Sequence, residues 1–406
     1  MSNTIPKAVF NTVESIKQLA VLPSSYSTYA QKDYPRARAF LLAYKNNKET
    51  FKAYRREIER FLQWSWLIQQ KSALRLRRED IEAFIAFCQK PFKSWIGLNQ
   101  VPRFLIKGGQ EQPNPKWRPF VAELSKPSIQ KGKRPTKDDF VLSDASIKII
   151  FSALSSFYNF LIQEEHITAN PISLIRQKSK FIRKKSGPTP IRRLSQSQWS
   201  YLTQAAKKME QEKPDKHNRT LFIIQALYGM YLRISELAAS ERWSPQMNSF
   251  YRDADSNWWF KVVGKGNKER DISVSDEMLE AFKQYRYTLH LSPLPLPTEN
   301  TPLIPKFIGK GGISDTRHIR RLVQECFDRA YQLMLKDNKR NDAAELKIAT
   351  VHWLRHTGIS DDVKIRPREH VRDDAGHSSG AITDKYIDIE KKARSLSAKK
   401  KKLVSS

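Results

Sequence analysis

Residues 258–274, WWFKVVGKGNKERDISV, predict two short β-strands joined by a turn, whereas most of the remaining chain has helical periodicity. Gly264, Gly266 and Asn267 supply the backbone freedom that a hairpin turn requires. The turn lacks the G-x-x-x-x-G-K-S/T spacing of a phosphate-binding P-loop. We therefore predict a mainly α protein with a small antiparallel β-sheet, an α+β fold.

Apolar residues spaced three or four apart predict the buried faces of helices on the N-terminal side of this hairpin. The pattern occurs at residues 51–61, 81–88 and 147–161. Ser143 or Asp144 is expected to cap the last of these helices, and the apolar run 221–228 predicts a helix that breaks near Gly229. Residues 92–140 lose the periodicity and are rich in Pro, Gly and Lys, so we expect a long loop or insertion there.

The chain of 406 residues carries 72 Lys and Arg against 42 Asp and Glu, a formal net charge of +30. This surplus favours a polyanionic partner, nucleic acid first and an anionic membrane surface second. The most apolar stretch, residues 147–162, still contains Lys148 and Asn159, so we expect no membrane-spanning segment. The N-terminus lacks the apolar core of a signal peptide, and Cys88 and Cys326 lie far apart, which excludes a zinc knuckle. A reducing cytoplasm fits best.

Changes in composition divide the chain into parts with different expected roles. We expect an N-terminal arm at 1–33, a helical domain at 34–175 with an insertion at about 92–140, a linker at 176–196, a second domain at 197–395 and a basic tail at 396–406. Eight basic and no acidic residues at 176–193 favour an extended segment that follows DNA phosphates over a merely soluble hinge. Its candidate DNA contacts include Arg183, Lys184, Lys185, Arg192 and Arg193.

Basic residues on the first predicted helix have two interpretations. Lys48, Lys52, Arg55 and Arg56 lie off its apolar stripe. They form either an ordinary solvated face or a surface that contacts DNA phosphates. In a chain with this positive surplus, the two interpretations have about equal weight.

Residues suited to chemistry occur in four segments of the second domain, around Arg233, Lys265, His352, and His377 with Tyr386. Each has an ordinary interpretation when taken alone, such as a surface ion pair, a hairpin turn or a packing residue. His352 and His356 have the i, i+4 spacing of a helical metal pair. The glutamate of the metalloprotease motif is missing, however, and the charge of Arg355 opposes a cation, so we predict no metal site.

Taken together, the four segments favour attack by a phenol on a phosphodiester. Two guanidiniums offer planar pairs of donors to the non-bridging oxygens of a phosphate. A phenol with a pKa near 10 needs a base or cationic surroundings to attack at neutral pH, and an imidazole can accept its proton. A lysine on a mobile turn can protonate the leaving oxygen.

The same segments resemble the tyrosine recombinases, also called the phage-integrase family. The family's first box, roughly G-L-R-I-S-E-L, is matched by YLRISEL ending at Leu237, and its hairpin G-K-G-N-K-E-R is matched letter for letter at 264–270. Its H-x-L-R-H-T is matched at 352–357, and its L-G-H-S-S with a tyrosine nine residues after the histidine is matched by AGHSS and Tyr386. These boxes span residues 197–390. The upstream half, especially 141–171, resembles the family's helical core-binding, SAM-like domain.

The resemblance implies which residues bind the phosphate. Arg233 and Arg355 would clamp the scissile phosphate, and His377 would donate a hydrogen bond to it. Glu236 would position this cationic cluster from behind. No metal or cofactor is implied, because the bond energy is kept in the protein–DNA link.

The resemblance also implies which residues transfer protons. Tyr386 would be the nucleophile that forms a 3′-phosphotyrosine. His352 would assist proton transfer at the tyrosine. Lys265 would be the general acid toward the 5′-oxygen.

Some positions depart from the family pattern. Tyr231 stands where a glycine usually precedes Leu-Arg, so the backbone there lacks glycine's freedom. Residues 373–375 replace the usual apolar approach to Gly-His, and the stretch 358–374 is unusually polar. The interval that contains 241–257 is longer than usual, so we expect an enlarged loop there.

We interpret the chain as a site-specific DNA recombinase, an integrase of a mobile element. The resemblance implies double-stranded DNA as partner, a homo-tetramer on DNA, exchange through a Holliday junction and a possible directionality factor, in the bacterial cytoplasm at the nucleoid. The alternatives are topoisomerase-like DNA relaxation of type IB and a non-catalytic DNA-binding protein on the same scaffold. A metal-dependent transposase would need a carboxylate cluster that we do not find.

Overall fold

The computed structural model describes residues 4–19, 21–124, 128–129, 132–173, 175, 192–264, 267–384, 386 and 398–399. The chain divides into two compact units, Met1–Pro188 and Thr189–Ser406, and each is described here by itself. Most of the expected linker, with Arg183, Lys184 and Lys185, lies outside the described residues, as does the tail apart from 398–399.

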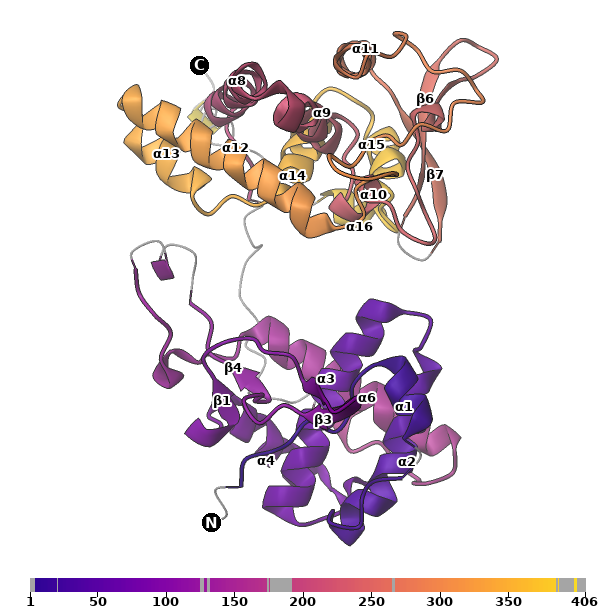
Figure 1. Ribbon diagram of the computed structural model, residues 1–406, viewed down its shortest axis with the longest axis vertical. Coiled ribbons are helices and arrows are strands. Elements are labelled where there is room, and N and C mark those ends of the chain that lie inside the picture. The colour runs from indigo at the N-terminus through magenta and orange to yellow at the C-terminus, as the bar shows by residue number, and fades with distance from the viewer. Residues whose placement is uncertain are drawn as a thin grey trace, which may run out of the picture. The chain divides into compact units, whose positions relative to one another are not determined.

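The first unit is mainly helical. Its helices include α1 (Val13–Gln18), α2 (Thr28–Ala43), α3 (Lys48–Trp64), α4 (Arg78–Gln89) and α6 (Asp144–Gln163) (Figure 1). The predicted apolar faces are buried as expected, for example at Ile58 and Phe61 on α3 and within 81–88 on α4, where Ile81, Phe84, Ile85 and Cys88 are buried. Ser143 caps α6, because its side chain accepts a hydrogen bond from the backbone N–H of Ser146.

The helix α6 corrects one expectation from the sequence. By length and composition it is apolar enough to cross a membrane, although we expected no segment of that kind. The helix passes this test because it is 20 residues long and holds few charged residues, and its exposed side includes Lys148 and Asn159. The other side supplies Ile150, Leu154 and Phe157 to the buried core of the first unit, which accounts for the apolar composition.

Residues 92–140 are more ordered than the loop that we expected. They contain β1 (Ile96–Gly97), which pairs in parallel with β4 (Phe120–Val121), and β2 (Phe104–Lys107), which pairs in antiparallel register with β3 (Gln110–Pro113). Trp95 and Phe120 are buried in the core of the unit. The guanidinium of Arg60 on α3 lies 4.6 Å from the ring centre of Phe120, so the insertion packs on the helices.

The N-terminal segment also packs on the helices, although we expected an arm at 1–33. Val9 and Phe10 are buried, and their backbone N–H groups donate to the carboxylate of Glu59 on α3. The side chain of Gln63, one helical turn further, donates to the carbonyl of Lys7 at 2.7 Å. These bonds satisfy backbone groups that would otherwise lose water, which fixes the described part of the segment against α3.

The second unit is a helical layer with a small sheet. Its helices are α8 (Gln196–Glu212), α9 (Pro214–Gly229), α10 (Ile234–Leu237), α11 (Asp276–Thr288), α12 (Thr316–Lys336), α13 (Arg340–Leu346), α14 (Val351–Asp362), α15 (Arg368–Ala375) and α16 (Gly380–Asp384), within the described residues. The apolar helix α9 packs against α8, α11, α12 and α14 and ends at Gly229, as predicted. It therefore forms the centre of the core.

The predicted hairpin is part of an antiparallel sheet at the edge of the second unit. Strands β6 (Trp258–Val263) and β7 (Glu269–Ser273) pair in the register Phe260 with Ile272, and β5 (Phe250–Arg252) pairs with the other edge of β6. The third strand lies in the region where we expected only an enlarged loop. Helix α15 packs against β7 (Figure 1), which brings the segment before the Gly-His turn to the sheet.

Candidate active site

The turn between α9 and α10 places Arg233 at the start of α10. Tyr231 in this turn has φ of 49°, a left-handed conformation that costs a residue with a β-carbon about 1–2 kcal/mol. The tyrosine thus adopts a backbone conformation that glycine adopts more easily. Arg233 follows, and its Nη1 donates to Oε1 of Glu236 at 2.9 Å.

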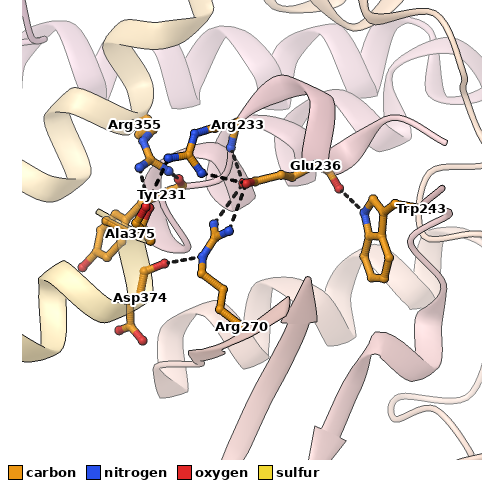
Figure 2. Close-up of polar contacts among 9 residues, drawn as sticks. Tyr231, Arg233, Glu236, Trp243, Arg270, Arg355, Asp374 and Ala375 are labelled. Carbon is orange, nitrogen blue, oxygen red and sulfur yellow. Dashed lines mark hydrogen bonds and ion pairs between the residues drawn. The ribbon is translucent and has the colours of Figure 1, made fainter. Parts of the chain in front are cut away.

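Glu236 on α10 is buried and is the shared acceptor of two arginines (Figure 2). Arg270 on β7 donates to its two carboxylate oxygens at 3.0 Å each, and Arg233 donates from the other side. Burial alone raises the pKa of Glu236, but hydrogen bonds from Arg270 and the charges of both arginines hold that pKa below its ordinary value. A side chain at Gly264 would meet both Arg270 and Glu236, so this glycine leaves room for the pair.

Arg355 on α14 is 3% exposed and donates to two backbone carbonyls, those of Tyr231 and Ala375 (Figure 2). Both acceptors are neutral, so these bonds orient the guanidinium without cancelling its charge. Burial and the nearby charge of Arg233 lower the pKa of Arg355 to about 10, which leaves it charged at neutral pH. Arg355 therefore keeps a positive charge that no carboxylate bonded to it neutralises among the described residues.

The Gly376–His377 turn closes this cationic cluster. Gly376 ends α15 with φ of 62°, and its carbonyl accepts a hydrogen bond from Arg233 at 3.4 Å. A β-carbon at Gly376 would lie 3.0 Å from Arg270, so both the backbone conformation and the close contact favour glycine.

Two histidines flank Tyr386. Nδ1 of His356 lies 2.6 Å from the tyrosine hydroxyl oxygen, and the ring of His377 is stacked on the tyrosine ring with centres 5.8 Å apart. His377 also contacts the hydroxyl of Thr383 at 2.9 Å. His352 lies one turn before His356 on α14, with ring centres 4.4 Å apart. The structure thus places His356, rather than His352, in hydrogen-bonding contact with the phenol.

The electrostatics of the site favour neutral imidazoles beside a protonated phenol. Burial, with the effects of His352 and Arg355, lowers the pKa of His356 to about 4. Burial and the charges of Arg355 and Arg233 lower the pKa of His377 to about 4 as well. Burial raises the pKa of Tyr386, while Arg355 and Arg233 act against it. With its proton on Nε2, a neutral His356 accepts the hydrogen bond of the phenol.

Lys265, the residue expected to protonate the leaving oxygen, lies outside the described residues. The other expected catalytic residues, namely Arg233, His352, Arg355, His377 and Tyr386, come from α10, α14, the turn after α15 and the segment after α16. The structure links them through direct contacts or shared neighbours, and Glu236 accepts a hydrogen bond from Arg233.

The expected DNA-contacting residues differ in their surroundings. On α3, Lys48 and Lys52 are exposed, and Lys52 pairs with Glu49 at 3.0 Å. Arg56 is exposed and bound to Glu57, but Arg55 is half-buried and donates to the carbonyl of Asn11. Arg55 therefore holds the N-terminal segment in place, which is a third interpretation that the helical pattern did not suggest.

The described part of the linker offers two further basic residues. Arg192 is exposed, and Arg193 lies 3.8 Å from Asp361 on α14. The exposed charge of Arg192 suits a phosphate contact, because a cation that neutralises a phosphate releases the counterions of DNA.

Sequence reasoning missed the roles of Arg270 and His356. Both lie inside matched segments, Arg270 as the last letter of GKGNKER and His356 as the second histidine of HWLRHT. The signal for Arg270 was its place in the matched hairpin segment, whereas its burial against Glu236 appears only in the structure. For His356, the helical spacing predicted only that it lies near His352 and gave no indication of its contact with Tyr386.

No model of a known protein family matches the chain. Over 252 residues, 60% of this chain and 69% of the relative, it is 26% identical to a Chlorobaculum parvum protein named tyrosine recombinase XerC. Over 311 residues, 73% of this chain and 84% of the relative, it is 25% identical to a Treponema denticola protein of the same name.

Among solved structures, XerH site-specific recombinase bound to palindromic difH substrate in a post-cleavage complex is similar in fold, with a TM-score of 0.55 at 13% identity. That likeness covers 96% of this chain and 94% of the other chain. Both units of the chain thus have counterparts in a recombinase fold.

Proposed function

We propose that this chain, which belongs to the tyrosine recombinase family, cuts and rejoins DNA through a covalent bond between Tyr386 and a 3′-phosphate. It is a site-specific recombinase, and we propose that it is the integrase of a mobile element. The observation that carries the proposal is the contact between the Tyr386 hydroxyl and His356, beside the charged Arg355.

In the proposed cleavage step, the phenol oxygen of Tyr386 attacks the phosphorus while the bond from phosphorus to the 5′-oxygen breaks. The phenol proton passes to Nδ1 of His356, which is neutral and 2.6 Å away. The product is a 3′-phosphotyrosine and a free 5′-hydroxyl. Attack of a 5′-hydroxyl on the phosphotyrosine reverses the step and returns the proton to the phenol.

Arg233 and Arg355 are proposed to bind the non-bridging oxygens of the scissile phosphate. Negative charge on these oxygens grows in the transition state, so fixed guanidiniums stabilise it more than they stabilise the ground state. Loss of one such donor is expected to lower the rate by about 10²–10³-fold. His377 is proposed to add a hydrogen bond from the same side.

The leaving 5′-oxygen needs a proton, and Lys265 is proposed as its donor from its place in the matched hairpin motif alone. His352, exposed on α14, is proposed to contact the phosphate or to relay protons with His356. Neither role requires a metal ion or a nucleotide.

We propose that the protein assembles as a tetramer on two double-stranded DNA sites and exchanges strands through a Holliday junction. We also propose that the protein acts with a directionality factor and is located at the nucleoid in the bacterial cytoplasm. The net charge of +30 supports close contact with DNA phosphates but carries no information about the target sequence.

The experiment is a search for covalent protein–DNA adducts. Wild type, Tyr386→Phe and Tyr287→Phe are each incubated with DNA of the host element and denatured, and the attached DNA is sequenced. Tyr287 is 77% exposed on α11, so its variant is a matched control for loss of a tyrosine hydroxyl. We expect adducts at one short recurring site with wild type and Tyr287→Phe, and none with Tyr386→Phe.

The other outcomes distinguish the alternatives. Adducts scattered without sequence preference would favour topoisomerase-like relaxation. Tight DNA binding without any adduct would favour a non-catalytic DNA-binding protein. Adducts that persist with Tyr386→Phe would show that another residue is the nucleophile.

A further inference from the structure

Residues that depart from the recombinase pattern meet in one polar network behind Arg355. The hydroxyl of Tyr231 donates to the carboxylate of Asp362 and accepts from Nη1 of Arg366 at 2.9 Å. Nη2 of Arg366 donates to Oδ2 of Asp374 at 2.6 Å. Tyr231 stands in place of a glycine, and the other residues belong to the unusually polar stretch before Gly376, so the departures are coupled in space.

Asp374 connects this network to the sheet. Its carboxylate accepts from the backbone N–H of Ser273 on β7 at 3.1 Å and from the Ser273 hydroxyl at 2.6 Å. Its backbone carbonyl accepts from Nε of Arg270 at 3.0 Å (Figure 2). Since Arg270 holds Glu236, and Glu236 holds Arg233, the network reaches the other clamp arginine through an unbroken series of bonds.

The network ends on the two acceptors of Arg355. One is the carbonyl of Tyr231 itself, and the other is the carbonyl of Ala375, the neighbour of Asp374. The Tyr231 ring is completely buried in a small apolar cluster with Ile359 and Ala375, against which Tyr386 also packs. A shift of the Tyr231 ring would therefore move the carbonyl that accepts from Arg355 and, at the same time, the apolar surface on which Tyr386 packs.

We propose that Tyr231, Asp362, Arg366 and Asp374 form a positioning unit that holds the carbonyl acceptors of Arg355 and thereby orients its guanidinium on the scissile phosphate. The link to catalysis rests on the function proposed above. None of the four side chains touches the reacting atoms, so each is a positioning residue rather than a catalytic one.

The backbone of Tyr231 supports this assignment. A residue with a β-carbon persists in the left-handed region only where its surroundings fix it. Here the side chain is fixed at its far end by two partners and along its ring by the apolar cluster. Burial and the charge of Asp362 raise the pKa of Tyr231, so its hydroxyl stays a donor throughout the physiological range.

The proposal is tested with Tyr231→Phe and Asp362→Asn, and the chain offers a matched control for each of them. Tyr228 also donates to an aspartate on α14, Asp361, at 3.2 Å. That pair lies one residue earlier on the helix and contacts neither acceptor of Arg355 among the bonds that the structure describes. Tyr228→Phe thus removes the same hydroxyl outside the positioning unit, and Asp361→Asn removes the same charge there while also removing the counter-charge of Arg193.

The first measurement is single-turnover cleavage of the duplex recovered in wild-type adducts, together with DNA binding. Tyr231→Phe and Asp362→Asn should each cleave about 10-fold more slowly at unchanged Kd, because a small misplacement of a positioning group can cost one to two orders of magnitude. The double variant should be little slower than either single one, since both break the same link. Tyr228→Phe and Asp361→Asn should cleave within about 2-fold of wild type, because their bond does not hold either acceptor of Arg355 in place.

The second measurement does not need DNA. In protein labelled with ¹⁵N in arginine, the Arg355 side-chain signal is the one lost in Arg355→Lys. Slow rotation of its guanidinium, held by two carbonyls, should become fast in Tyr231→Phe and stay slow in Tyr228→Phe. Circular dichroism shows whether each variant is folded.

The two measurements separate the failures. If wild type cleaves DNA but Tyr231→Phe cleaves equally fast, the positioning unit is wrong while the proposed function stands. If wild type forms no adduct, the proposed function fails, and unchanged Arg355 rotation in folded Tyr231→Phe would overturn the positioning unit as well. A loss of cleavage equal in Tyr228→Phe and Tyr231→Phe would also overturn it, because it would reveal a general effect on stability.

Discussion

The Tyr386 hydroxyl lies 2.6 Å from Nδ1 of His356, and His356 follows Arg355 directly on α14. One helix thus carries both the residue that contacts the hydroxyl of the proposed nucleophile and a residue proposed to hold the phosphate. Because the two residues are consecutive on one helix and both side chains are hydrogen-bonded, movement of one group relative to the other is restricted. In the cleavage step proposed above, this arrangement would couple deprotonation of the phenol to correct placement of the phosphate.

Replacement of the contacting histidine tests the assignment of the base. His356→Gln removes the proton acceptor but keeps a polar side chain, so the cleavage rate at neutral pH should fall by about 10²-fold, within the range of general base catalysis. The rate of the variant should then rise with pH up to the ionisation of the phenol, whose pKa burial raises. Rapid-quench cleavage from pH 6 to 10 measures both effects.

His352→Gln is the matched variant on the preceding turn of α14. If His352 contacts the phosphate, this variant should lose rate without acquiring the rise with pH. The opposite result, a pH-dependent rate in His352→Gln and none in His356→Gln, would return the base to His352.

The low pKa values of the histidines make stability depend on pH. The ordinary histidine pKa is 6.5, whereas His356 and His377 titrate at about 4 in the folded protein. Between these values the unfolded chain binds more protons, so the free energy of unfolding rises with pH. The stabilising contribution is complete above about pH 6.5 and is lost as the pH falls towards 4.

Urea unfolding of wild type and His356→Gln from pH 4 to 7 measures this dependence. The variant should show a shallower slope in the window, because one depressed histidine has been removed. Identical slopes would show that the folded pKa of His356 is close to its ordinary value.

The sequence predicts the second unit well where a pattern is local. Helix faces and the hairpin follow from the spacing of apolar residues, and burial on one face is what creates that spacing. Pairings such as Glu236 with Arg270, or Tyr231 with Asp362, join segments far apart in the chain. No periodicity records them, so they appear only in the folded structure.

In the first unit, the sequence pattern also fails to indicate a long-range contact, here one that buries a segment without regular structure. The segment with Val9 and Phe10 has no helical repeat long enough to indicate burial, yet both side chains are buried. Its position depends on Glu59, which looks from the sequence like one more charged residue on a helix. A carboxylate that accepts backbone N–H groups can hold a segment that has no regular structure of its own.

The shared carboxylate of Glu236 should contribute strongly to stability. Glu236→Gln leaves Arg270 and Arg233 without their counter-charge in a buried place, and loss of one partner of a buried pair typically costs about 3–5 kcal/mol. Glu269→Gln is the matched control, because Glu269 is exposed and lies 3.9 Å from Lys261. Exposed pairs contribute about 0–1 kcal/mol, so equal losses for the two variants in urea unfolding would contradict the shared-acceptor role.

Gly358 should be intolerant of even one added methyl group, because α14 crosses the end of α9 at this point. A β-carbon there would collide with the carbonyl oxygen of Tyr228 and would lie 3.1 Å from the ring of Tyr231. Alanine is favoured over glycine within a helix by about 1 kcal/mol, but overpacking against rigid backbone typically costs about 1–3 kcal/mol or more. We expect Gly358→Ala to lower the free energy of unfolding and to slow DNA cleavage, since the displaced α14 carries Arg355 and His356. Gly380→Ala, whose β-carbon would meet no atom within 4 Å, should leave both properties unchanged. A Gly358→Ala protein as stable and as active as Gly380→Ala would show that α14 can move away from α9 without cost, and that its position does not control the site.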